Sequence, residues 1–233
     1  MNRRATTRIL SLSIVALVAA ACGGAASVDV SPSPAPTTAA PTTAAPSPSG
    51  ATTLEWTVSD KSKATVKVRE QLAVFSFPSD AVLVATGARG SFQLNGDGTF
   101  ADGSRITFDV SSLTSDDSLR DSFVKQSVLG TRQFPTATFA PTKASGLTLP
   151  LAANGHVTFT LSGKLTIHGV TKDVTFDVDA TRTGDALRAT ATLKPTVKFE
   201  DFGMPQPASP GRVLNVVDEI HLVVDLVASG PAS

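Results

Sequence analysis

The sequence predicts an all-β domain over residues 54–229, an eight-stranded antiparallel β-barrel with one short helix. The first observation is strict alternation. Val174, Phe176 and Val178 alternate with polar residues, which places one face of the strand on an apolar interior. The second is a series of similar runs separated by Gly and Asp-Gly turns. Strands of this number and length fit a closed barrel wide enough for one small ligand. A β-sandwich is the alternative architecture.

The expected strands are runs of alternating or β-branched residues between turn signals. They are 63–70, 82–94, 104–110, 136–140, 156–167, 172–182, 186–199 and 213–228. The pair around His168-Gly169 is expected to form a hairpin, because both flanking runs alternate and the Gly supports a tight turn.

One segment has helical spacing instead. Residues 116–128 place Leu119 and Phe123 on one face, with acidic residues in the first turn, where they complement the helix dipole. Ser115 precedes the segment and is the expected N-cap. We therefore expect a short helix here.

The N-terminus has the pattern of a lipoprotein signal peptide over residues 1–21. A basic stretch and a short apolar stretch lead to Ala19-Ala20-Ala21 and then Cys22, the order of a bacterial lipobox. Cys22 is therefore the expected lipidation site; an ordinary secretory signal with an incidental Cys is the alternative. Residues 22–53 are rich in Pro, Thr and Ala, which favours a disordered linker.

Four motifs resemble those of the YceI-like family of lipocalin-like barrels. The hairpin reads Gly163-Lys-Leu-Thr-Ile-His-Gly-Val-Thr171, close to the family's G-x-L-T-x-H-G-V-T. The others are Leu113–Asp121, the F-P-x-x-x-F-like Phe134–Phe139 and the D-F-G turn at Asp201–Gly203. The resemblance implies a barrel that binds a polyisoprenoid.

Two departures from the family pattern indicate a divergent branch. The family often carries a His soon after its Arg-Asp pair, whereas Ser122 and Phe123 follow here. Its first strand usually carries His-Ser, whereas this region reads Asp60-Lys-Ser-Lys63. Head-group contacts through those histidines are therefore not expected.

The candidate ligand-binding residues inside the barrel are Phe108, Phe159, Phe176 and Leu222, which project from the apolar face of alternating strands. They belong to a larger inward set that would either fill the interior or line a tunnel for an apolar chain. The resemblance favours the tunnel. The other inward positions are Phe92, Leu94, Ile106, Leu161, Leu165, Ile167, Val178, Val224 and Leu226.

Two polar residues are candidates for the polar end of a ligand. Arg120 could meet the phosphate or other head group of an amphiphile at the barrel mouth, because a guanidinium suits oxyanions. The alternative is a structural ion pair that pins the helix to the barrel. His168 could lie over a head group or serve as a turn residue with a hydrogen-bonding role.

Several function classes find no support in the sequence. The formal net charge is +0, and it becomes acidic once the leader arginines are removed, so no nucleic acid partner is expected. No nucleophile elbow, paired-carboxylate site or metal-ligand spacing is present, so neither catalysis, a metal nor a cofactor is expected.

The sequence thus predicts a non-catalytic lipoprotein, anchored to the cell membrane on its extracytoplasmic face through Cys22. Its expected partner is an isoprenoid or other long-chain lipid. The alternative is a filled barrel that serves as a cell-surface scaffold or interaction module.

Overall fold

The computed structural model describes residues 54–208 and 212–230, and the lipobox, Cys22 and the linker lie outside these ranges. Nine strands are present in the described part of the chain. They are β1 (Leu54–Val58), β2 (Lys63–Leu72), β3 (Ser79–Leu94), β4 (Arg105–Thr114), β5 (Thr136–Ser145), β6 (Asn154–Ile167), β7 (Val170–Thr183), β8 (Ala186–Leu193) and β9 (Val213–Ser229).

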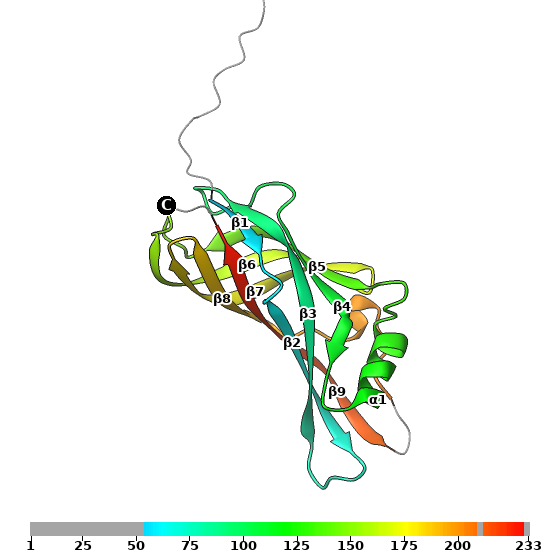
Figure 1. Ribbon diagram of the computed structural model, residues 1–233. Helices are drawn as coiled ribbons and strands as arrows, with labels where there is room; N and C mark the ends of the chain where they lie inside the picture. Colours follow the sequence, from blue (N-terminus) through cyan, green and yellow to red (C-terminus); the bar gives the residue numbers. More distant parts are fainter. Residues whose placement is uncertain (1–53, 209–211, 231–233) are drawn as a thin grey trace, which may run out of the picture. The chain divides into compact units, whose positions relative to one another are not determined.

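Strands β2 to β9 close into a ring of eight (Figure 1). Each strand pairs antiparallel with the next in sequence, and β9 closes the ring by pairing with β2. Ring closure leaves no free sheet edge among these strands, which is how barrels avoid edge-to-edge association. The predicted eight-stranded antiparallel barrel is confirmed.

Strand β1 was not among the expected runs, and it shares one position in the ring with β2. Both strands lie between β3 and β9, at successive levels along the barrel axis. The turn between them buries Ser62 completely. Its hydroxyl donates to the Val227 carbonyl at 3.1 Å and accepts from the Val227 amide at 2.9 Å, so the ladder continues across the break.

Strand β8 ends at Leu193, six positions before the expected end of that run at residue 199. Pro195 lacks an N–H and cannot continue a central ladder, so the chain leaves the sheet after Lys194. It then forms the short helix η2 (Glu200–Phe202), and Phe202 is fully buried against the ring.

The predicted helix is present as α1 (Ser118–Phe123), followed by a π-helical turn, η1 (Val124–Val128). Its N-cap is Asp117 and not Ser115, because the Asp117 carboxylate accepts from the Leu119 amide at 2.8 Å. Ser115 instead donates its hydroxyl to Asp121 at 2.6 Å, which holds the preceding loop against the helix. In the described ranges, no helix combines the length and apolarity needed to span a membrane.

Candidate functional site

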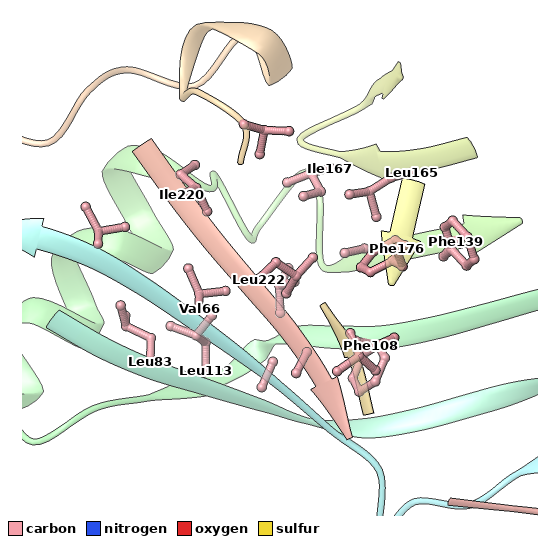
Figure 2. A pocket seen from close by; sticks show the side chains of 18 of the residues that line it. Val66, Leu83, Phe108, Leu113, Phe139, Leu165, Ile167, Phe176, Ile220 and Leu222 are labelled. Carbon is pink, nitrogen blue, oxygen red and sulfur yellow. The ribbon is translucent and has the colours of Figure 1, made fainter. Parts of the chain in front are cut away.

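A cavity of about 580 Å³ lies inside the ring. All eight ring strands contribute inward side chains to its wall, and so do β1, α1 and η1. Figure 2 labels side chains of the wall that come from β2 to β7 and from β9. The volume falls in the range of small-molecule sites and is well above an isolated packing defect. The interior is therefore hollow, and the alternative of a completely filled barrel does not describe this structure.

The four apolar residues singled out from the sequence all line this cavity. Phe108 and Phe176 are buried, whereas Phe159 and Leu222 are half-buried. Phe139, which the sequence analysis left out, packs edge-on against Phe176 with ring centroids 5.1 Å apart (Figure 2). Their contact with a ligand stays a prediction, because the cavity shows only that they share one apolar space.

One end of the cavity is closed by Trp56, which is 1% exposed. Arg182 lies over the indole with its guanidinium carbon 5.2 Å from the ring centroid. The same guanidinium donates to the carbonyls of Gly184 at 3.0 Å and Leu151 at 3.1 Å. Gly230 packs so closely on Trp56 that any larger residue would clash with the ring.

The other end of the cavity opens to the surface. Val74 in the β2–β3 hairpin and Leu119 and Phe123 in α1 line the cavity and are also solvent-exposed. A side chain can be in both sets only where the cavity wall becomes the outer surface. These residues therefore form the rim of a mouth.

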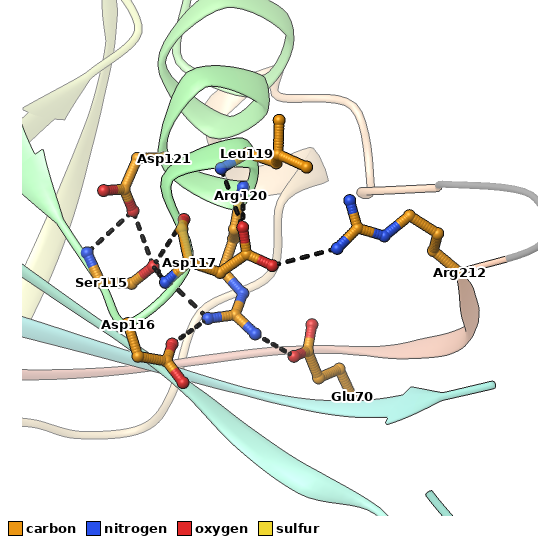
Figure 3. A network of polar contacts seen from close by, with 8 residues as sticks. All are labelled: Glu70, Ser115, Asp116, Asp117, Leu119, Arg120, Asp121 and Arg212. Carbon is orange, nitrogen blue, oxygen red and sulfur yellow. Dashed lines mark hydrogen bonds and ion pairs between the residues drawn. The ribbon is translucent and has the colours of Figure 1, made fainter. Parts of the chain in front are cut away.

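The polar side chains of the lining, among the described residues, are concentrated at this mouth. Arg120 donates to Glu70 Oε1 at 2.7 Å and also contacts Asp116 (Figure 3). Asp117 accepts from the Arg212 guanidinium at 3.1 Å. Only Thr138 adds another polar group, further along the wall.

The Glu70–Arg120 pair is largely withdrawn from water, with side-chain exposures of 8% and 16%. Burial lowers the pKa of Arg120, but the attraction of Glu70 and Asp116 outweighs burial, so the pKa is raised above its ordinary value. Arg120 is thus a charged group already paired with two carboxylates. This is the structural ion pair that the sequence analysis held as the alternative to a free phosphate-binding fork.

Sequence reasoning missed Glu70, although a signal was present. In β2 the positions that face the cavity are Ala64, Val66, Val68, Glu70 and Leu72. A carboxylate in phase with four apolar residues is an inward charge, which is stable only when it is paired. Its partner Arg120 lies fifty positions away in the chain, so the pairing itself was not visible.

His168 is not among the residues that line the cavity, and its role over a head group stays a prediction. It is a turn residue with φ of 51°, and its Nδ1 is 3.3 Å from the Phe202 carbonyl oxygen. Its ring packs edge-on against Phe134 with centroids 4.7 Å apart. The family-like hairpin motif therefore joins the β6–β7 turn to η2 through His168, whereas its Leu165 and Ile167 line the cavity wall.

The remaining histidines make surface contacts. His156 pairs with Asp179 at 2.9 Å and His221 with Glu219 at 3.7 Å. Within residues 54–208 and 212–230, no group of three His, Cys, Asp or Glu side chains lies close enough to hold a metal ion.

The model of the YceI-like domain matches residues 56–228, which is the whole ring with its helices. The chain belongs to the YceI-like family. The resemblance read from the hairpin and turn motifs is thus confirmed for this YceI-like protein, and its hollow ring is the family fold. No curated protein matches the chain.

Solved structures with the same fold are distant in sequence. A polyisoprenoid binding domain from Saccharophagus degradans is 13% identical, with a TM-score of 0.56 over 76% of this chain and 99% of that one. BcnA from Burkholderia cenocepacia is 20% identical, with a TM-score of 0.51 over 72% and 97%. A YCEI protein from Campylobacter jejuni is 17% identical, with a TM-score of 0.50 over 70% and 91%. At these identities the likeness establishes the fold.

Proposed function

We propose that this YceI-like protein is a non-catalytic carrier that holds a long-chain lipid of the isoprenoid type in its ring. The observation that carries the proposal is the cavity of about 580 Å³, whose wall is apolar except at its mouth. Each CH₂ moved from water into such a space contributes about 0.8 kcal/mol. A long apolar chain therefore binds without a specific polar contact along its length.

Distant likeness supports the lipid class of the ligand. The Saccharophagus degradans relative is described as a polyisoprenoid binding domain, and it shares the fold over nearly its whole length. The scaffold alternative needs an interior filled by side chains, and the cavity argues against it. We propose no catalytic residues, because the polar side chains of the described cavity wall are either in ion pairs or isolated from one another.

We further propose that the polar end of the ligand sits at the mouth and carries no negative charge. Arg120 and Arg212 are each paired with a carboxylate, so the positive charge that either offers to a phosphate is reduced. Glu70 uses Oε1 for Arg120, which leaves its Oε2 as an acceptor among the described residues of the cavity wall. A hydroxyl can donate to that oxygen, whereas a phosphate would be repelled by it.

The N-terminal pattern supports a proposal for the place of the protein in the cell. We propose that Cys22 is diacylated and that the ring is held outside the cytoplasm, at the end of the Pro-rich linker. A Cys22→Ser chain is expected to leave the membrane fraction after a carbonate wash. A chain that stays fully membrane-bound would contradict the anchor.

The lipid proposal is tested first by mass spectrometry of an organic extract from native protein. Titration then uses Trp56, the single Trp of the sequence, which lines the closed end of the cavity and reports its filling. Phe159→Trp adds a second reporter further along the wall. Geranylgeraniol is expected to change both emissions saturably and to bind at least about 10-fold more tightly than its monophosphate, or roughly 1.4 kcal/mol.

Three results would count against the proposal. Absence of any extracted lipid together with silent reporters would return the scaffold alternative. Equal or tighter binding of the monophosphate would contradict the uncharged polar end while leaving lipid binding intact. A reporter response that persists when the interior carries a new charge at Phe176 would show that the probe binds elsewhere.

A further inference from the structure

The large apolar side chains that remain exposed in the described residues gather at the mouth end of the ring. They come from the β2–β3 hairpin, the first part of β3, α1 and the first part of β9. They are Val74, Phe75, Phe77, Val82, Leu119, Phe123, Leu214 and Val217. Figure 1 shows these elements side by side at the end of the ring opposite β1. A contiguous exposed apolar patch on one end of a protein indicates an interaction surface.

The hairpin between β2 and β3 presents the most exposed members of this patch. Val74 is 83% exposed and Phe77 is 80% exposed. The turn is nevertheless held in place: Gln71 donates to the Phe75 carbonyl at 2.6 Å, and the Ala73 amide donates to the Arg212 carbonyl at 2.9 Å. The apolar side chains are thus displayed on an ordered loop that is tied to the start of β9.

The patch is continuous with the cavity. Val74, Leu119 and Phe123 are part of both, so at these three side chains the apolar wall of the interior passes over the rim onto the outer surface. A partner that covers the rim would share one dry space with the cavity. Such continuity fits an apolar medium from which a lipid can enter.

Several charges around the rim lie in ion pairs. Arg69 lies 3.1 Å from Asp80 beside the hairpin, and Arg212 lies 3.1 Å from Asp117 beside α1. Paired charges at the rim favour contact with a membrane through insertion of the apolar side chains, with the aromatic rings at the level of the lipid head groups. They give a charged protein partner little to recognise.

We propose that this apolar rim, formed by the β2–β3 hairpin, α1 and the start of β9, docks onto a lipid bilayer. An apolar ligand then passes between the membrane and the cavity without crossing water. This inference rests on the proposed lipid function, and it adds the surface from which the ligand comes.

The position of the tether is compatible with such docking. The described chain enters the ring at β1, at the end opposite the mouth (Figure 1). A Pro-rich segment the length of residues 23–53 spans on the order of 90 Å at about 3.1 Å per residue. The longest strand, β9 with 17 residues, spans on the order of 55 Å at about 3.3 Å per residue. A chain anchored through Cys22 can therefore turn its mouth toward the membrane that holds it.

The test uses the full mature chain with Cys22→Ser, so that only the folded ring can bind vesicles. Phosphatidylcholine vesicles with a fraction of phosphatidylglycerol are floated with this chain and with a Phe75→Asp, Phe77→Asp variant. A Ser145→Asp, Thr148→Asp variant is the control, because it adds the same charge at exposed positions near the closed end. Far-UV spectra and melting temperatures verify that all three chains are folded.

The unmodified rim and the control are expected to float with the vesicles, insensitively to salt, whereas the rim variant loses at least 10-fold in partitioning. Transfer of geranylgeraniol from vesicles to the rim variant is expected to slow by a similar factor. Its equilibrium binding, measured by Trp56 fluorescence after dilution from ethanol, is expected to change less than 2-fold.

Equal flotation of the rim variant and the control would overturn the proposal. So would an unmodified chain that leaves the vesicles untouched but forms dimers that the rim variant abolishes, because the patch would then bind a second copy. Either result leaves the Trp56 titration to judge lipid binding by itself. If the Trp56 titration failed while flotation was normal, the proposed lipid-binding function would be contradicted and the docking surface would be supported.

Discussion

Each end of the cavity holds an arginine, and the two arginines are stabilised in different ways. At the closed end Arg182, 5% exposed, is held by carbonyl oxygens and the face of Trp56. At the mouth Arg120 is held by the carboxylates of Glu70 and Asp116 (Figure 3). The neutral acceptors fix Arg182 over Trp56, where the two side chains close this end of the cavity. Charged partners leave polar groups in the cavity wall, where a ligand can reach them.

The largest expected effect comes from a charge placed between these two ends. Phe176→Asp removes a ring that is 3% exposed and leaves an unpaired carboxylate in an apolar wall. We expect a loss of at least about 3 kcal/mol of unfolding free energy, the lower end for deletion of a buried Phe, together with loss of lipid uptake. Urea unfolding and the Trp56 titration measure the two effects.

The control for this variant is Thr181→Asp, on the same strand but on its exposed outer face. It is expected to change stability and lipid uptake little. If Phe176→Asp kept native stability, the position of β7 in the ring would be wrong.

A smaller effect is expected from breaking the ion pair at the mouth. Arg120→Met leaves Glu70 buried without its cation, which costs about 3 kcal/mol in comparable buried pairs. The double change Glu70→Leu, Arg120→Met is expected to recover most of this loss, because it removes both charges together. A double-mutant cycle in urea measures the coupling.

Arg182→Met at the closed end tests whether the two arginines are stabilised in different ways. It removes hydrogen bonds to two carbonyls without stranding a charge, so we expect a loss of roughly 1–3 kcal/mol that no single second change recovers. It is also expected to leave the preference for geranylgeraniol over its monophosphate unchanged. A double-mutant cycle at the mouth with no coupling would make the comparison of the two ends untenable.

The smallest effect concerns the acid that begins the helix at the mouth. Hydrogen bonds from the amides of Leu119 and Arg120, with Arg212 nearby, lower the pKa of Asp117 below its ordinary value. The Asp117 carboxylate therefore stabilises the fold at a pH above the pKa that this group has in the unfolded chain. The stabilisation disappears as the pH falls through the lowered pKa that the group has in the folded chain. Asp117→Asn is expected to melt at a lower temperature at neutral pH and to match the original chain in acid.

Asp102→Asn, at an exposed loop position near the closed end, is the control and is expected to melt like the original chain at every pH. A difference in melting temperature between Asp117→Asn and the original chain that persists in acid would show that the Asn side chain disturbs the cap itself. Thermal melts over a pH series make both measurements.

Sequence reasoning was most successful where side chains repeat with the period of the backbone. Val174, Phe176 and Val178 face the interior in the structure as their alternation predicts, because successive residues of a strand point to opposite faces. The helix after β4 was predictable for the same reason, from the spacing of Leu119 and Phe123. Its N-cap was not, since Ser115 and Asp117 are both good caps and the Asp121 contact decided between them.

The sequence by itself determined eight of the nine strands, their inward faces and the kinship with the YceI-like family, because all three reside in local periods and short motifs. Only the tertiary structure decided that the interior is hollow, since inward side chains look alike in filled and hollow rings. It also decided that Arg120 meets Glu70 and that His168 meets the Phe202 carbonyl. Contacts between residues distant in the chain depend on how the ring closes, and no local pattern in the sequence records that closure.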